Sequence, residues 1–460
     1  MFGSMMFPAF LGMVVLVFFL LPAKYRSVVL LLSSYLACAF ISLSALVVLV
    51  VVSVWVWVEG IWIENLQKKG KNSSRAAAVS AVCICIMVLA VFKFRISGLV
   101  MPVGLSFYVF QAIGYLTDIA KGKCSAEKNF CFLGCYFAFF PKLVSGPIER
   151  ESDFLPQIKR LGKVKFWDRG RLSTAFTYML WGYFMKMVVA DRLAMQVSVL
   201  FERPQEFDSF WLVLGMLFYT IQIYCDFAGY SYIAIGCAWI FGIELTQNFI
   251  APYQAASITE FWRRWHVSLS SWLRDYLYIP LGGSRKGIGR KCINTMIVFA
   301  VCGIWHGAGF QFIVWGFLHG IYSVIDTLLQ RKTQKIPAGR MLTFVEVAFA
   351  WIFFRAKDLE QAQIYISRML TTGVHMEQMK SAREALGFGG VEILVVGMGI
   401  FLVWAVDELC SRKQIHLPIL IQQRQNFVRY FIFYLLIIGI FIFGIYGPGY
   451  HAEQFIYMQF

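Results

Sequence analysis

The chain has 460 residues, of which 59% are hydrophobic and 15% are charged, and it carries a formal net charge of +16. Two runs without any charged residue, Ser27–Val58 and Cys292–Ile325, are 32 and 34 residues long. A hydrocarbon core of about 30 Å is crossed by about 20 apolar residues in a helix, so each run is expected to fold into more than one pass or to re-enter the membrane. The composition excludes an ordinary soluble domain and predicts an all-α polytopic membrane protein.

The positive charge is spread over short loops between the apolar segments, as at Lys68, Lys69 and Lys71. This distribution is typical of the positive-inside rule rather than of nucleic-acid binding, so no nucleic-acid partner is expected. Lys24 and Arg26 follow the first apolar stretch, and no charge precedes it. We therefore expect an external N-terminus and no cleavable signal.

Apolar segments follow one another along the chain without a soluble domain between them. In order they are roughly 5–22, 27–58, 76–91, 99–119, 130–144, 172–190, 210–243 (two passes or one broken pass), 292–329 (two passes), 341–354, 390–406 and 428–447. They predict about eleven to thirteen membrane segments, including re-entrant or broken helices, in a single domain over residues 1–460. Two basic loops interrupt them, Glu149–Arg171 and Glu260–Lys291.

The 11 cysteines indicate neither a disulfide framework nor a metal site. Most lie inside apolar segments, none forms a CxxC pair and the total is odd. Buried cysteines of this kind act as small hydrophobic side chains. We expect no metal and no tightly bound cofactor.

The stretch Thr259–Gly283, TEFWRRWHVSLSSWLRDYLYIPLGG, predicts an amphipathic helix. Ser257 and Glu260 have the spacing of a capping box, and the sequence PLGG at residues 280–283 would end the helix. Aromatic and leucine side chains recur every three to four residues on one face, and arginines and serines occupy the other. Such a helix is expected at the membrane interface or along a polar cavity.

The arginines of this helix, Arg263, Arg264 and Arg274, allow two interpretations. Their guanidinium groups fit either lipid phosphates or an anionic, phosphate-bearing substrate, and the helix alone does not separate the two. His266 lies beside the tryptophans rather than among the arginines and is a second candidate for function.

His306, in the sequence VCGIWHGAGFQF, lies near the middle of the second charge-free run. An ionisable side chain at that depth usually faces a bundle interior, a cavity or a partner. The alternative is a GxxxG packing seam from Gly303 to Gly307, with His306 hydrogen-bonded across it. We favour a catalytic or ligand-binding role.

Asp226 is the corresponding carboxylate, because the nearest charged residues, Asp208 and Glu244, are each 18 positions away. A buried carboxylate must be paired, protonated or solvated. It could therefore orient a histidine or bind one of the arginines. His319 is another buried candidate, for which packing or a hydrogen bond is the preferred interpretation.

Three chemistries fit a deeply placed histidine beside a basic aromatic helix. In acyl transfer, imidazole removes a proton from an acceptor hydroxyl while the oxygen attacks a thioester. A proton-coupled transporter could instead use His306 and Asp226 as a relay. Haem ligation lacks an obvious second axial histidine.

Taken together, the motifs resemble the membrane-bound O-acyltransferase (MBOAT) family, and within it the AlgI-like alginate and polysaccharide O-acetylation branch. The resemblance runs through the segments 101–119, FPKLVSGPIER (140–150), DFAGYS (226–231), NFIAPYQ and the aromatic helix (248–287), GIWHGAGFQFIVWGFLHG (303–320), WIFFRA (351–356) and FIYMQF (455–460).

The resemblance implies helices arranged around a central pore or tunnel, and an acyltransferase in the bacterial cytoplasmic (inner) membrane. It implies that His306 is the catalytic base and His266 a supporting residue, with an acyl group, expected to be acetyl, taken from acetyl-CoA or another thioester donor. The partners implied are an extracytoplasmic acetyltransferase or polysaccharide-modification protein and membrane lipid. Substrate binding is assigned to Arg263, Arg264, Trp265, Arg274, Asp226 and Trp305.

One position departs from the AlgI-like pattern, because Tyr232 stands where such chains commonly have Asp. The DltB-like D-alanyl transfer branch also lacks that Asp and is the alternative within the family. The uninterrupted sequence WLRDYLYIPLGGSRKG favours the polysaccharide acetylation branch.

Overall fold

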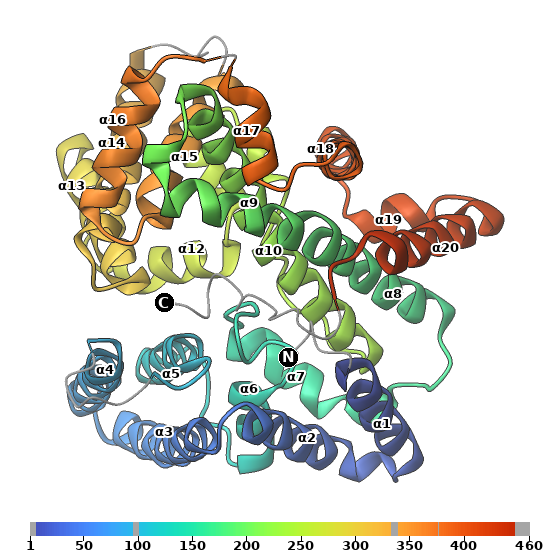
Figure 1. Ribbon diagram of the computed structural model, residues 1–460. Coiled ribbons are helices and arrows are strands. Elements are labelled where there is room, and N and C mark those ends of the chain that lie inside the picture. Colours follow the sequence, from blue (N-terminus) through green and yellow to red (C-terminus); the bar gives the residue numbers. More distant parts are fainter. Residues whose placement is uncertain (1–5, 95–100, 333–338, 376, 447–460) are drawn as a thin grey trace. The chain divides into compact units, whose positions relative to one another are not determined.

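A computed structural model describes residues 6–94, 101–332, 339–375 and 377–446 of the chain (Figure 1). The terminal motif FIYMQF lies outside the described residues. By its internal contacts the chain divides into two compact units, one made of residues 1–179 and 230–247 and the other of residues 180–229 and 248–460. The described secondary structure is helical apart from one isolated β-bridge, between Phe249 and Trp265.

The first unit holds a series of helices connected by short turns. They are α1 (Met6–Leu20), α2 (Arg26–Ile41), α3 (Leu43–Lys69), α4 (Lys71–Lys93), α5 (Leu105–Ala120), α6 (Phe130–Ala138), α7 (Glu151–Lys159) and the larger part of α8 (Arg169–Tyr183), with 3-10 turns at Ala23–Tyr25 and Leu161–Lys163. The predicted division of the run 27–58 is confirmed. It occurs at Ser42, whose extended backbone ends α2 and whose hydroxyl accepts a 3.3 Å hydrogen bond from the amide of Ala45.

The second unit contains the remaining helices. They are a π-helix at Phe184–Ala190, α9 (Asp191–Glu202), α11 (Ile258–Arg264), α12 (Val267–Leu273) with a π-helix at Arg274–Tyr278, α13 (Ile288–His306), α14 (Phe310–Lys332), α15 (Gly339–Arg355), α16 (Leu359–Thr371), α17 (Gln378–Ala385), α18 (Gly390–Lys413), α19 (Leu417–Gln422) and α20 (Asn426–Phe443), with 3-10 turns at Pro204–Glu206 and Pro252–Gln254. The helix α10 (Ser209–Ile240) contributes to both units.

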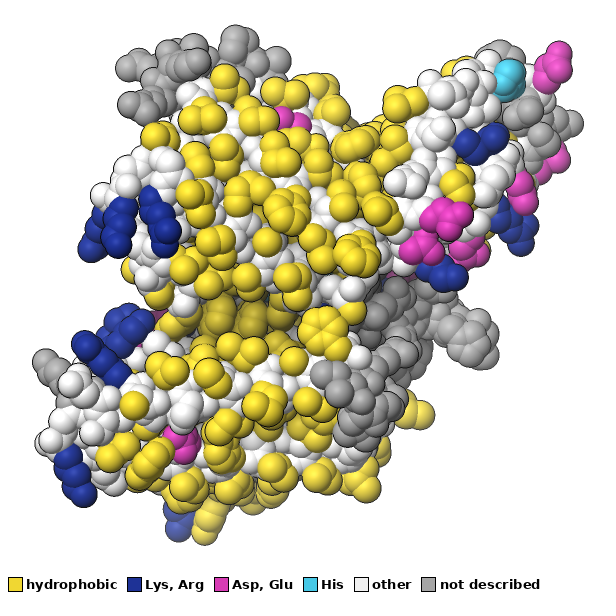
Figure 2. Space-filling view, turned by 90° about the vertical axis from the view of Figure 1, so that its left-hand side faces the viewer, with side chains coloured by type: hydrophobic (Ala, Val, Ile, Leu, Met, Phe, Trp, Pro, Cys, Tyr) yellow, Lys and Arg dark blue, Asp and Glu magenta, His cyan; other side chains and the backbone are white. Residues whose placement is uncertain are grey.

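Among the described residues, eight helices are long and apolar enough to cross a membrane: α2 with the 3-10 turn Ala23–Tyr25 before it, α3, α4, α10, α13, α14, α18 and α20. Their outward faces carry many exposed hydrophobic side chains, and Figure 2 shows such side chains spread widely over the visible surface, with Lys and Arg near its margins. Fewer helices reach full length than the eleven to thirteen segments expected, because α5, α6 and α15 are shorter.

Two predictions about helix continuity are wrong. The segment 210–243 forms the single unbroken helix α10 of 32 residues, with Gly229 packed against the carbonyl oxygen of Gly182 instead of breaking the helix. The aromatic stretch after Ser257 is not one helix, because α11 ends at Arg264 and α12 begins at Val267. The predicted cap is confirmed, since the Ser257 hydroxyl accepts from the Glu260 amide at 3.2 Å.

Candidate active site

The structure brings the two predicted catalytic histidines to the same tryptophan. The ring of Trp305 lies 4.6 Å from the ring of His306 and 6.4 Å from the ring of His266, centroid to centroid. All three side chains are buried, with exposed fractions of 8%, 2% and 0%. Residues 40 positions apart in the sequence therefore share one apolar site in the second unit.

His306 is positioned by a tight helical hairpin. It is the last residue of α13, and the turn Gly307–Gly309 leads directly into α14. A Cβ atom on Gly303 would lie 2.4 Å from the carbonyl oxygen of Phe312, and one on Gly316 would lie 2.4 Å from that of Phe299. The glycines thus let two antiparallel helix backbones touch, which fixes the end of α13 and its histidine. The backbone contact is made by Gly303 and Gly316, whereas Gly307, the second glycine of the seam considered from sequence, faces the ring of Phe312.

His266 is positioned by a break in the chain between α11 and α12. Its backbone adopts the left-handed conformation (φ 44°, ψ 53°), which is uncommon for residues other than glycine. The amide of Val267 donates to the backbone carbonyl oxygen of Asn248 at 3.0 Å. The amide of Ser268 donates to the side-chain Oδ1 of Asn248 at 3.1 Å. Asn248 therefore ends the helical path and directs the imidazole inward.

The setting of His266 determines its protonation. Burial lowers the pKa of His266 to about 3. Because desolvation disfavours the charged ring, the imidazole is neutral at physiological pH. The ring of Phe227, from α10, packs edge-on against it at 4.8 Å. A neutral imidazole can accept a proton through one nitrogen and donate through the other.

Aromatic rings surround the opposite side of His306. Trp315 and Phe354 lie 5.0 and 5.1 Å from its ring, and Trp351 stacks on Trp315 at 5.7 Å. Trp351 in turn contacts Trp265 at 5.1 Å. Trp265, predicted to bind substrate, is only 1% exposed and belongs to this wall. The aromatic wall thus encloses the histidine site with buried apolar side chains.

His319 packs against the same wall, as the sequence predicted. The indole nitrogen of Trp262 donates to its Nδ1 at 3.3 Å, and the ring of Trp315 lies 5.0 Å away. This hydrogen bond makes Nδ1 the acceptor, so the neutral ring carries its proton on Nε2.

Asp226 is bound to a residue that the sequence analysis did not identify. Its Oδ1 makes a short ion pair with Lys186 Nζ, which also lies 2.8 Å from Oδ1 of Asp191. All three side chains are buried. Burial lowers the pKa of Lys186, but the two carboxylates outweigh that effect and hold it above its usual range. The lysine lies in the π-helix Phe184–Ala190, a type of distortion often found at functional sites.

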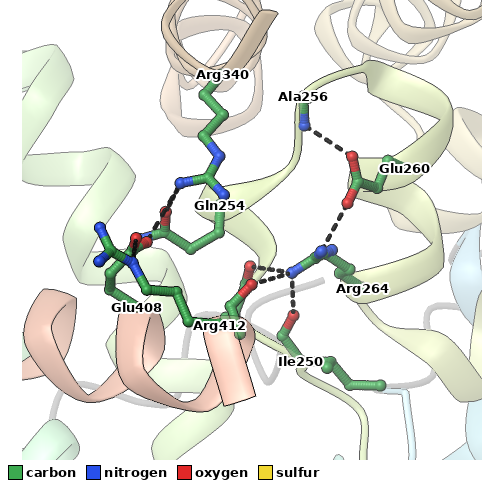
Figure 3. Close-up of polar contacts among 10 residues, drawn as sticks. Ile250, Gln254, Ala256, Glu260, Arg264, Arg340, Glu408 and Arg412 are labelled. Atoms are coloured by element: carbon green, nitrogen blue, oxygen red, sulfur yellow. Dashed lines mark hydrogen bonds and ion pairs between the residues drawn. The ribbon is translucent and has the colours of Figure 1, made fainter. Parts of the chain in front are cut away.

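The three arginines of the aromatic stretch do not form one cluster. Arg264 Nη2 binds Glu260 at 2.6 Å (Figure 3). Its Nη1 binds the Ser411 hydroxyl at 3.1 Å. Glu260 also accepts from the Ala256 amide at 2.9 Å. Arg264 thus anchors α11 to α18. Arg274 is exposed and pairs with Asp275 at 2.8 Å, and Arg263 is exposed.

Two residues important for the geometry were missed from sequence. Asn248 lies in the motif NFIAPYQ. Its hydrogen bond to the start of α12 depends on the break at His266, which the sequence pattern does not indicate. Lys186 had a visible signal, because it is a single positive charge within the predicted apolar segment 172–190 and is followed by Asp191. Within the described parts of the chain, no group of three or more His, Cys, Asp or Glu is placed to hold a metal ion.

Comparison with known proteins defines the class of protein. The sequence profile of the membrane-bound O-acyltransferase family, MBOAT, matches residues 128–359, which include both histidines, Asp226 and Lys186. The chain therefore belongs to the MBOAT family.

Individual relatives agree with this membership. The chain is similar to a probable alginate O-acetylase AlgI of Pseudomonas putida, with 38% identity over 61% of this chain and 57% of the relative. It is also similar to a peptidoglycan O-acetyltransferase of Helicobacter pylori, with 34% identity over 58% of this chain and 56% of the relative. The chain is also similar to a teichoic acid D-alanyltransferase of Bacillus subtilis, with 26% identity over 55% of this chain and 67% of the relative. The matches to the first two relatives thus span just over half of their length.

Proposed function

We propose that the protein is a membrane O-acyltransferase that passes an acyl group, acetyl in the first instance, from a cytoplasmic thioester donor to an exported or cell-surface polysaccharide. The observation that carries the proposal is the meeting of His266 and His306 on Trp305 within a buried aromatic site. Family membership and the names of the relatives support the reaction class.

In the proposed reaction His306 is the general base. Its imidazole takes the proton of an acceptor hydroxyl while that oxygen attacks the thioester carbonyl, so a C–O bond forms and the C–S bond breaks. The proton then passes to the departing thiolate. His266, neutral because of its burial, would hold the donor or acceptor through a hydrogen bond. The surrounding aromatic rings would keep water away from the thioester.

The remaining assigned residues would act around this centre. Trp305, between the two histidines, would orient them, and the exposed Arg263 and Arg274 would attract the phosphates of a donor such as acetyl-CoA. Asp226 would act indirectly, by holding Lys186 in the core. We expect an extracytoplasmic acetyltransferase or polysaccharide-modification protein as the partner, in a bacterial inner membrane.

D-alanyl transfer to teichoic acid is the second candidate, supported by the similarity to the Bacillus subtilis D-alanyltransferase. The two candidates differ in the donor, which is acetyl-CoA in one case and a carrier-bound D-alanyl thioester in the other. A transporter is the rival from another class, and it would move its substrate without consuming any thioester.

The test is turnover of radiolabelled acetyl-CoA by the purified protein. The His306→Ala variant is expected to abolish the release of CoA, whereas His416→Ala should leave it unchanged, because His416 is an exposed histidine before α19. Equal turnover in all three proteins would contradict the proposed role of His306. Turnover of D-alanyl carrier thioester alone would favour the second candidate, and substrate flux without thioester loss would favour transport.

A further inference from the structure

A cavity of about 580 Å³ lies in the second unit, apart from the residues assigned to acyl transfer. It is lined by side chains of α10, the turn Pro252–Gln254, α15 and α18. Its volume falls within the range of about 300–1,000 Å³ that is typical of ligand sites. The cavity is large enough to take a ligand, and its lining indicates which kind.

One wall of the cavity is apolar and belongs to membrane-spanning helices. Ile221 comes from α10, and Ile400, Val403 and Trp404 come from α18. Both helices are among the candidate spans. Phe344 of α15 completes this wall. A wall formed by spanning helices lies at the depth of lipid acyl chains, and its side chains match such a chain chemically.

The other side of the cavity carries two arginines at helix ends (Figure 3). Arg340 is the second residue of α15, and Arg412 lies in the last turn of α18. Both bind Glu408, Arg340 at 3.3 Å and Arg412 through a shorter contact. The arginine side chains are 55% and 73% exposed, whereas Glu408 is 10% exposed. Arg412, at the end of the spanning helix α18, lies at the depth of lipid headgroups, and Arg340 binds the same carboxylate.

The two arginines at this end of the cavity can bind an anionic group. Glu408 is bound by both arginines. Asp407 also lines the cavity, and its carboxyl accepts a 2.8 Å hydrogen bond from the Tyr224 hydroxyl. Each guanidinium has five N–H donors and can bind Glu408 and a phosphate together.

We propose that this cavity binds a membrane glycerophospholipid, with its phosphodiester on Arg340 and Arg412 and an acyl chain against the apolar wall. A phosphodiester carries one negative charge and can accept hydrogen bonds from both guanidinium groups, each of which has N–H donors beyond those that bind Glu408. A CoA thioester carries several phosphates and a polar nucleotide, and these fit an apolar wall poorly. The ligand is therefore a lipid of the surrounding bilayer rather than the acyl donor.

The experiment is native mass spectrometry of delipidated full-length protein with added dioleoylphosphatidylglycerol, compared with dioleoylglycerol, which has the same chains without phosphate. We expect the protein to retain dioleoylphosphatidylglycerol and not dioleoylglycerol. The double variant R340Q/R412Q should weaken retention about tenfold or more, because the phosphodiester would lose both of its charged hydrogen-bond donors. Arg424→Gln removes another exposed arginine and should change nothing.

A second variant tests the apolar wall while leaving the arginines in place. Ile400→Trp fills the cavity and should abolish retention of the phospholipid, and thermal unfolding confirms that the variant is folded. Equal retention of dioleoylglycerol, unchanged retention in R340Q/R412Q, or displacement of the phospholipid by equimolar acetyl-CoA would each overturn the proposal. Retention of dioleoylphosphatidylethanolamine would support it, because that lipid also carries one phosphodiester.

Discussion

The side chain of Asn248 accepts a 3.1 Å hydrogen bond from the amide of Ser268, two residues after His266. Together with the bond from the Val267 amide to the Asn248 carbonyl, it defines the turn that carries the histidine. Asn248 is itself fully buried. The position of a candidate catalytic side chain is thus set by a residue 18 positions earlier in the chain.

Replacement of Asn248 by Ala is expected to lower thioester turnover and to destabilise the protein by about 1–3 kcal/mol, because a buried amide loses its acceptor. Asn248→Asp keeps the acceptor oxygen and should retain more activity. The matched control is Asn129→Ala, which removes a similar cap from α6, where Asn129 accepts from the Cys131 amide at 2.9 Å. Turnover and thermal unfolding are measured together. Equal loss of turnover in Asn129→Ala would contradict a specific role for Asn248.

The buried neutral His266 predicts a loss of stability in acid. Its pKa in the folded protein is about 3, below the ordinary value of 6.5, so the unfolded chain binds the proton first. The folded state therefore loses stability as the pH falls from about 6.5 toward 3. In His266→Asn this part of the decline should disappear, and Asn tolerates the left-handed backbone. The check is the unfolding temperature against pH; parallel curves for both proteins would argue against this assignment.

The cluster of Lys186, Asp191 and Asp226 predicts an order among three variants. Lys186→Met removes the cation shared by two buried carboxylates and should be the most damaging, whereas Asp226→Asn leaves Lys186 with Asp191. Breaking a buried ion pair costs about 3–5 kcal/mol. The combined Lys186→Met, Asp226→Asn variant should be more stable than Lys186→Met alone. Unfolding in detergent measures the order, and a greater loss in Asp226→Asn than in Lys186→Met would contradict the role of Lys186 as the cation shared by the two carboxylates.

The glycine contact between α13 and α14 predicts that Gly303→Ala is poorly tolerated. The new Cβ would meet the Phe312 carbonyl oxygen at 2.4 Å, so a backbone must move, and overpacking of this kind costs about 1–3 kcal/mol. Because His306 follows one turn later, turnover should fall as well. Gly397→Ala, within α18, has nothing within 4 Å of the added atom and should be neutral or stabilising. Similar effects of both substitutions on the unfolding temperature would refute the contact.

Features that depend on local sequence were predicted well. The division of the runs 27–58 and 292–329 into two passes each and the Ser257 cap were predicted, and they depend on residues close together in the sequence. The burial of His306 also followed from a local feature, the charge-free run around it.

Features that depend on distant partners were not predicted. The amphipathic pattern after Ser257 continues through His266, but hydrogen bonds between this stretch and residues 248–250 accompany the end of the helix there. The three arginines share one face in the sequence pattern, but Glu260 and Ser411 engage Arg264 separately. The partner of Asp226 is Lys186, 40 positions earlier. The sequence indicates which charged side chains are buried, whereas the packing of helices that are distant in the sequence determines which residues bind them.

The helix α10 has a consequence for how the chain matures during synthesis. Its residues 209–229 belong to the second unit, and its residues 230–240 belong to the first. The first unit therefore lacks residues 230–247 until Gln247 has left the ribosome, by which time residues 180–229 of the other unit have already been synthesised. Domains that are continuous in sequence can fold one after the other as they emerge. Here the N-terminal unit must wait for a helix that begins in the other unit, so a translational pause before residue 230 would leave it open.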